Sequence, residues 1–407
     1  MRNTLHVLNY QYSPWIDDKL HEKSLLFRTL EDVANFDIVY IEKEDINDVS
    51  DKPWVTECFL EQHSIEEFWF SFPDNLQYDV RRGIGTIILS NYRYSQTIDA
   101  FWYIHDLVKK HGQEIPFDNM IYAVGSISAM RDWKEWKDIE FLTPPHMLNI
   151  VQFCADETFD SFMCDADVLK QYNPVAHKAR DKMFTCLNHK IRDHRILTIA
   201  GLAERKLLNK GYVSFCSNDG EDTLGKYTTV PTREELIQSS ISYLENKLPL
   251  VADYIGTDMK YKQDITSWLL QDSYFSIITM PEFFITGVDD HRDTSSFGRA
   301  IIKPIINKQP FLVAAPHLYL SDLQKYGYET FSEWIDESYD NEPDDLKRLD
   351  MMLDEAERLA ALPRDSWDSI IESMFVTLEN NFRRFENAKT EQYTNEHGLC
   401  LFEKYTN

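Results

Sequence analysis

The sequence predicts an α/β protein with two Rossmann-like lobes and a C-terminal helical segment. Three observations support this fold class. Short β-rich runs alternate with amphipathic helical patterns along most of the chain, which is typical of βαβ units and parallel sheets. The chain has 407 residues, which is enough for two domains. Its hydrophobic content of 43% and aromatic content of 13% are sufficient for buried cores.

The first lobe is expected over residues 1–165. Its predicted strands are residues 5–9, 36–41, 86–90, 120–124 and 148–153. Helical patterns cover residues 20–36 and 96–110. Since such strands are joined by helices, we expect them to lie parallel, with ligands bound at their carboxyl ends.

The second lobe is expected over residues 166–345, after a turn signal at Asn173-Pro174. Its predicted strands are residues 183–187, 212–215, 274–279 and 311–315. Its predicted helices are residues 194–209, 233–246, 264–270, 296–307 and 318–326. The remainder, 346–407, is expected to be a helical segment that continues to about residue 387.

Charge is distributed unevenly along the chain. The formal net charge of −26 repels nucleic acid and anionic membranes at long range. Residues 178–210 nevertheless carry nine Lys/Arg against three acids. Residues 329–358 carry twelve Asp/Glu against three Lys/Arg, a run that we interpret as a solvated helical face.

The six cysteines are scattered and include no C-x-x-C pair, which favours a reducing compartment. No apolar run reaches the roughly 18 residues that span a bilayer. The N-terminus lacks the apolar core of a signal peptide. We therefore expect a cytoplasmic protein without membrane partners, in the host cytoplasm if the chain is viral, and leave its oligomeric state open.

The stretch 183–211 predicts a strand, a basic loop and an amphipathic helix that Asp193 caps and after which Gly211 ends the unit. Arg192, His194 and Arg195 stand where this helix begins. Cations are unfavourable at a helix N-terminus, whereas anions bind there. The pattern predicts either a phosphate-bearing ligand or arginines that pair with acids of the other lobe.

A second strand–loop–helix segment, 274–315, also carries cations. Arg299 and Lys303 are four residues apart on one predicted helix face, after a possible cap at Ser295 or Ser296. Two cations at this spacing repel each other. An anion, or a carboxylate such as Glu282, between them would attract both. Glu282 follows a strand end, where it is expected either to accept hydrogen bonds from ribose hydroxyls or to form an interlobe salt bridge.

Motifs for metals and common cofactors are weak. Asp289, Asp290, His291 and Asp293 form either a divalent-cation loop or, as short acidic loops usually do, a solvated one. His189 and His194 have poor zinc spacing. There is no GxxxxGK[ST], GxSxG or HExxH motif. We predict no metal and no bound cofactor.

Three segments resemble a known family. CLNHKIRDHRILTIAGLAERKLLNKG resembles the LN-x-x-x-R-x-H-R strand–helix unit of a group of glycosyltransferases common in phage and marine bacterial genomes. YFSIITMPEFF resembles their vTEt strand end, and KPIINKQPFLV with the acidic run after it resembles their KPI…PF…iDESYD…D…R ending. That ending is also similar to the nucleotide-sugar lobe of alpha-1,3-fucosyltransferases and exostosin-like enzymes. The resemblance covers about residues 182–352.

The resemblance implies a GT-B-like, metal-independent glycosyltransferase that moves a sugar from a nucleotide-sugar to an acceptor hydroxyl. The acceptor would be a glycan, a lipid-linked or protein acceptor, or a modified base in phage DNA. The residues expected to bind the donor are Asn188, Arg192, His194, Arg195, Glu282, Arg299 and Lys303. The candidates for the general base are Asp17, Asp18 and His21, just after the first strand.

The chain departs from the family pattern at one place. The family has a Thr-Glu-Lys triplet before the KPI motif, where this chain has Gly298, Arg299 and Ala300. In fucosyltransferase-like lobes that glutamate contacts the ribose and that lysine the phosphate. The departure supports an alternative, a non-catalytic interaction protein on a degenerate glycosyltransferase fold.

Overall fold

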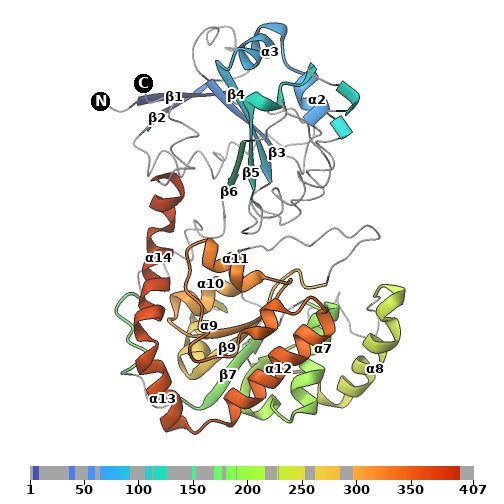
Figure 1. Ribbon diagram of the computed structural model, residues 1–407, viewed down its shortest axis with the longest axis vertical. Coiled ribbons are helices and arrows are strands. Elements are labelled where there is room, and N and C mark those ends of the chain that lie inside the picture. Colours follow the sequence, from blue (N-terminus) through green and yellow to red (C-terminus); the bar gives the residue numbers. More distant parts are fainter. Residues whose placement is uncertain are drawn as a thin grey trace. The chain divides into compact units, whose positions relative to one another are not determined.

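The computed structural model divides into two compact units, each containing a parallel sheet (Figure 1). The first unit comprises residues 1–159, 291–297 and 387–407, and the second comprises 160–290 and 298–386. The structure describes residues 3–8, 36–41, 54–59, 65–91, 106–107, 109–111, 114–124, 127, 149–152, 169–176, 180–188, 190–215, 227, 229–252, 262–284 and 297–394.

In the described part of the first unit, six strands form a sheet in the order β2-β1-β3-β4-β5-β6, and every pair is parallel. They are β1 (Asn3–Leu8), β2 (Phe36–Ile41), β3 (Trp54–Phe59), β4 (Gly85–Asn91), β5 (Met120–Val124) and β6 (Asn149–Gln152). The five predicted strands are confirmed. The predicted helices at 20–36 and 96–110 lie mostly outside the described residues.

Sequence reasoning missed β3 and the helices that follow it, α2 (Ile65–Phe70) and α3 (Asp74–Arg81). The strand is held by the buried ring of Trp54, whose Nε1 donates to Asp79 Oδ2 at 3.3 Å. Gly85 of β4 faces this ring, and a Cβ there would lie 2.3 Å from it. The close contact therefore requires glycine. Because this contact joins two different strands, it could not be recognised from the short and only partly apolar run that forms β3.

The second unit contains a sheet in the order β10-β9-β7-β8, again with parallel pairs. Its strands are β7 (Lys182–Leu187), β8 (Gly211–Ser214), β9 (Ser273–Thr279) and β10 (Phe311–Ala314). The first helices are α7 (Asp193–Glu204), α8 (Glu234–Leu244), α9 (Lys262–Gln271), α10 (Arg299–Ile306) and α11 (Tyr319–Lys325). All four predicted strands and these five predicted helices are present, with ends shifted by a few residues.

The strand order reverses beside β7. The chain runs from β7 to β8 on one side, then returns to β9 on the other side of β7 and continues to β10. Such a reversal is where open parallel sheets bind ligands, at the carboxyl ends of the two central strands. The first unit begins with the same order, β2-β1-β3-β4. The α/β prediction with two parallel sheets is thus confirmed.

The C-terminal helices α12 (Asp345–Ala361), α13 (Arg364–Ser373) and α14 (Phe375–Thr394) are present. Trp367 of α13 is fully buried, and its ring stacks on Tyr274 and Phe275 of β9 at centroid distances of 5.6 and 5.3 Å. Through these contacts α13 packs on β9, and α12, α13 and α14 up to residue 386 belong to the second unit. The predicted C-terminal helices within 346–407 are thus present.

The acidic run 329–358 is only partly a solvated face. Asp340 is buried and accepts hydrogen bonds from the backbone N–H groups of Leu320 and Ser321 at 2.9 and 3.2 Å. Glu355 is also buried, and its carboxylate accepts from the backbone N–H of Asp336 and from Arg358. These carboxylates organise the turns around α11 and α12, so the interpretation of the run as a solvated helical face holds only for its exposed acids.

Candidate functional site

The carboxyl ends of β7, β8 and β9 are joined by one buried residue, Asn188. Its Oδ1 accepts a hydrogen bond from Thr279 Oγ1, and its Nδ2 donates to Cys186 Sγ at 3.3 Å. Its backbone N–H donates to the carbonyl of Ser214 at 2.9 Å. Asn188 thus fixes the three strand ends relative to one another, and it is not among the residues that line the cavity beside them.

That cavity has a volume of about 210 Å³ and lies where the strand order reverses. Three of its lining residues are cationic: Lys190 from the loop after β7, Arg195 from the first turn of α7, and Lys303 from α10. The remaining lining residues are Thr185, Leu187, Leu270, Ser276, Ile277, Ile278, Thr279, Ala300 and Pro304. Two cations predicted from separate motifs, Arg195 and Lys303, therefore line one cavity.

Arg195 is bound mainly through neutral groups. Its Nη1 donates to the carbonyl of Lys190 at 3.2 Å and its Nη2 to that of Thr279 at 3.4 Å. Its Nε is buried and has no hydrogen-bond partner among the described residues. Burial and the nearby charge of Arg192 lower the pKa of Arg195 to about 10, while Glu282 acts in the opposite direction. A half-buried cation in this state is stabilised by an anion that accepts from it.

His194 has a structural contact instead of a place in the cavity. Its Nε2 donates to the carbonyl of Met280 at 2.8 Å, and its ring stacks on Phe283 with centroids 5.4 Å apart. Burial first, and then the charge of Arg195, lower the pKa of His194 to about 3. The imidazole is therefore neutral and holds the loop after β9 against α7, rather than lining the cavity with Arg195.

Asp193 does not cap α7, contrary to the sequence prediction. The N-cap is Arg192, whose side chain makes no capping hydrogen bond. The Asp193 carboxylate is buried and turns instead to accept from Tyr227, Thr229 and Arg233 at 2.9, 2.6 and 2.8 Å. The carboxylate therefore links the segment before α8 to the start of α7. Three side-chain donors stabilise it more than the single backbone N–H that it would accept from as a helix cap.

The ends of α7 and α10 differ from the sequence prediction in two further ways. The N-cap of α10 is Gly298 rather than Ser295 or Ser296, and the latter two lie outside the described residues. Gly211 begins β8 instead of ending α7, and a Cβ there would lie 2.3 Å from the Phe184 ring. The helix instead ends at Glu204 with Arg205 as its C-cap, and Lys206 after it adopts a left-handed φ of 58°.

The remaining predicted residues fall into two groups. Arg192 is exposed and Glu282 half-buried, and neither lines the cavity. Arg299 is the first residue of α10, but its side chain lies outside the description. The predicted base candidates Asp17, Asp18 and His21 also lie outside the described residues, as do Asp289, Asp290, His291 and Asp293 of the acidic loop.

No group of three or more metal-binding side chains occurs in the described part of the chain. Among the same residues, no helix is long and apolar enough to cross a bilayer. The sequence analysis overlooked Lys190 as a site residue, although the basic loop that contains it is the signal that could have identified it. It also overlooked the hydroxyls of Thr185 and Ser276, which hydrogen-bond to each other at 2.9 Å.

A comparison with models of known protein families gives no match for this chain, and a comparison with curated proteins gives none either.

Proposed function

We propose that this chain is a glycosyltransferase with a GT-B-like fold, and that the cavity of its second unit holds the diphosphate of a nucleotide-sugar. The observation that carries the proposal is Arg195, a half-buried cation with carbonyl partners and a buried Nε that has no partner in the described structure. Phosphate oxygens are the acceptors that a guanidinium prefers. The motif resemblance over about residues 182–352 supports a nucleotide-sugar as the carrier of that phosphate.

The size of the cavity limits which part of the donor it takes. Sites that enclose a whole small-molecule ligand usually measure about 300–1,000 Å³. A volume of about 210 Å³ suits a diphosphate and leaves the base and the sugar outside. Lys190, Arg195 and Lys303 would then surround the phosphates, while the sugar remains accessible to the acceptor.

The same cations suit the chemistry of glycosyl transfer. The bond between the anomeric carbon and the phosphate oxygen breaks, and the nucleoside diphosphate leaves with the electron pair. A new bond forms between that carbon and the acceptor oxygen, whose proton passes to a general base. Fixed cations stabilise the negative charge that develops on the leaving group. The base is proposed among Asp17, Asp18 and His21, and the acceptor is a glycan or a modified base in DNA.

A thermal-shift panel tests the donor. UDP-, GDP-, ADP- and CMP-sugars, the free nucleoside diphosphates and inorganic pyrophosphate are added to the full chain. A ligand at 100 times its Kd stabilises a protein by about 2.7 kcal/mol, which is a clear rise in Tm. We expect shifts with pyrophosphate and with one nucleotide class, and no shift with any of them would overturn the proposal.

Turnover is tested with the donor that binds. Release of the nucleoside diphosphate is followed in the presence of glycan acceptors and of plain and hydroxymethylated DNA. Transfer to one of them establishes the enzyme. Tight donor binding without release in any mixture would favour a non-catalytic protein, the alternative to which the Gly298-Arg299-Ala300 departure points.

A further inference from the structure

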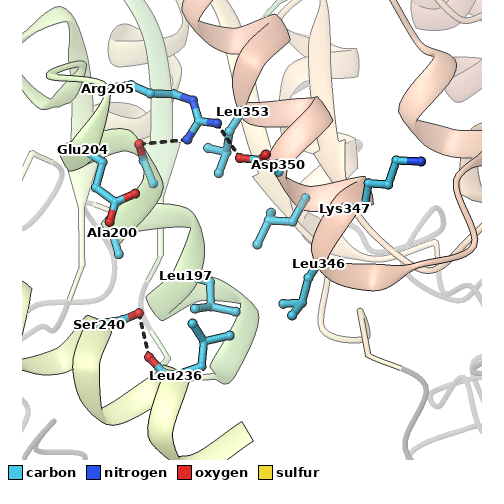
Figure 2. A pocket seen from close by; sticks show the side chains of 12 residues that line it. Leu197, Ala200, Glu204, Arg205, Leu236, Ser240, Leu346, Lys347, Asp350 and Leu353 are labelled. Atoms are coloured by element: carbon cyan, nitrogen blue, oxygen red, sulfur yellow. Dashed lines mark hydrogen bonds and ion pairs between the residues drawn. The ribbon is translucent and has the colours of Figure 1, made fainter.

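A second cavity of the second unit is an open groove between α7, α8 and α12, with a volume of about 450 Å³ (Figure 2). It shares no residue with the cavity that contains Arg195. Its lining residues are Leu197, Ala200, Gly201, Glu204, Arg205, Leu236, Ser240, Leu346, Lys347, Leu349, Asp350 and Leu353. The groove is thus independent of the proposed donor site.

Each helix contributes one stripe of its surface to the groove. Leu346, Leu349 and Leu353 follow the i, i+3, i+7 spacing of one face of α12. Leu236 of α8 and Leu346 of α12 enter from opposite sides (Figure 2) and remain 40% and 45% exposed. Leu197 of α7 lies between these helices and is buried. Exposed leucines that face one another across a groove mark a place where further apolar surface can be buried.

The rim of the groove is acidic. Arg205 is shared by three carboxylates, with N–O distances of 2.5, 2.6 and 3.8 Å, and Lys347 is paired with a fourth at 2.6 Å. Glu204 adds a fifth carboxylate at the lining. Glu204 and Asp350 line the groove, and three further acids are the ion-pair partners of its two lining bases, so five acids lie at or directly beside the lining against two bases: Glu204, Glu342, Asp350, Asp354 and Glu357.

We propose that this groove binds an amphipathic helix of a basic partner protein. The groove is lined by apolar side chains from three helices, so a fourth helix can pack into it. Apolar residues at i, i+3 or i+4, and i+7 of that helix would contact the leucines of the groove. Lysines or arginines beside that stripe would face the acidic rim, and the net charge of −26 would attract such a partner at long range. A second copy of this chain is a poor occupant, because it would bring two acidic surfaces together.

The test uses a synthetic, fluorescently labelled helical peptide with leucines at i, i+4 and i+7 and lysines at the other positions. Its binding to the full chain is measured by anisotropy at low and high salt. We expect saturable binding that weakens steeply with salt, and at least about tenfold weaker binding to the Leu236→Asp and Leu346→Asp variants. Both leucines are partly exposed, so both variants are expected to fold, which circular dichroism verifies.

Two controls make the result specific. Val376→Asp changes a residue that is 67% exposed on α14, outside the groove, and must leave peptide binding unchanged. A peptide with the same composition in scrambled order removes the apolar stripe but keeps the charge. Equal binding of the scrambled peptide, equal binding to the groove variants, or no binding of the patterned peptide would each overturn the proposal.

Discussion

Arg195 and Arg205 stand at the two ends of α7 in opposite electrostatic surroundings. Arg205 donates to Asp350 and Asp354 of α12, at 2.5 and 2.6 Å, and these carboxylates raise its pKa against a desolvation that lowers it. Arg195 donates to two backbone carbonyls, and burial lowers its pKa. The charge of Arg205 is used in packing two helices, whereas that of Arg195 is held in a cavity by neutral groups.

The contrast separates structural cations from candidate ligand-binding ones. Besides Arg205, three bases of the 178–210 run have structural partners: Arg180 donates to the carbonyl of Pro174, Lys182 to that of Asn209 and Lys210 to that of Ala360. A count of charges therefore overstated the size of a basic binding face. Arg195 also donates to carbonyls, but it lines a cavity and its buried Nε has no partner among the described residues, and this combination marks it as the candidate for binding a ligand.

The largest effect is expected at Asp193, two residues before Arg195. Its carboxylate binds an arginine of another segment, as the acids that bind Arg205 at the other end of α7 do. Asp193→Ala removes the acceptor of three side-chain hydrogen bonds and leaves Arg233 without its carboxylate. We expect the free energy of unfolding to fall by about 3 kcal/mol in urea titrations. Asp365→Ala, an exposed acid in the first turn of α13, is the matched control. A similar loss in both variants would contradict the structural role of Asp193.

The next effect concerns ligand affinity at the cavity. Arg195→Ala should weaken binding of pyrophosphate about 100-fold, equivalent to about 2.7 kcal/mol, because charge-assisted hydrogen bonds are lost. Its Tm without ligand should stay the same or rise, since a half-buried cation without a carboxylate partner in its hydrogen bonds is removed. Calorimetric titration measures the affinity, and Arg205→Ala should bind as the wild type does. Equal weakening in the two variants would erase the distinction between the two ends of α7.

A third effect is a pH dependence from His194. Its folded pKa of about 3 lies below the ordinary value of 6.5, so the fold favours neutral imidazole. The contribution is complete above about pH 6.5 and is lost as the pH falls, because the unfolded chain takes up a proton there. We expect about 1.5 kcal/mol of lost stability between about pH 6.5 and pH 5. His194→Gln should flatten this slope in urea unfolding, and an unchanged slope would show that other groups cause it.

The smallest effect is expected at Arg205. Its acidic partners are mostly exposed, so Arg205→Ala should lower the free energy of unfolding by about 1 kcal/mol. A double-mutant cycle with Asp354→Ala isolates the pair, and about 0.5 M salt should reduce its coupling energy. No coupling between the two side chains would mean that α7 and α12 are held by apolar packing alone.

Local patterns in the sequence predicted much of the second unit. The burial of every residue of β9 explains why its apolar run was recognised as a strand. The link between Arg195 and Lys303 was also foreseen, from two helix starts that each carried cations without an evident stabilising role. Local patterns did not foresee the turn of Asp193 away from the helix end, because its donors lie 34 to 40 residues further along the chain.

The sequence by itself determined where strands and helices form and where positive charge accumulates, since periodicity and local charge depend on neighbouring residues. Only the tertiary structure decided which charges are neutralised. Arg205 finds acids 145 and 149 residues away, whereas Arg195 finds only carbonyls as hydrogen-bond partners among the described residues. The physical reason is that the order of β7 and β9 in the sheet and the docking of α12 set the surroundings of each end of α7. These long-range contacts make one arginine structural and leave the other facing a cavity.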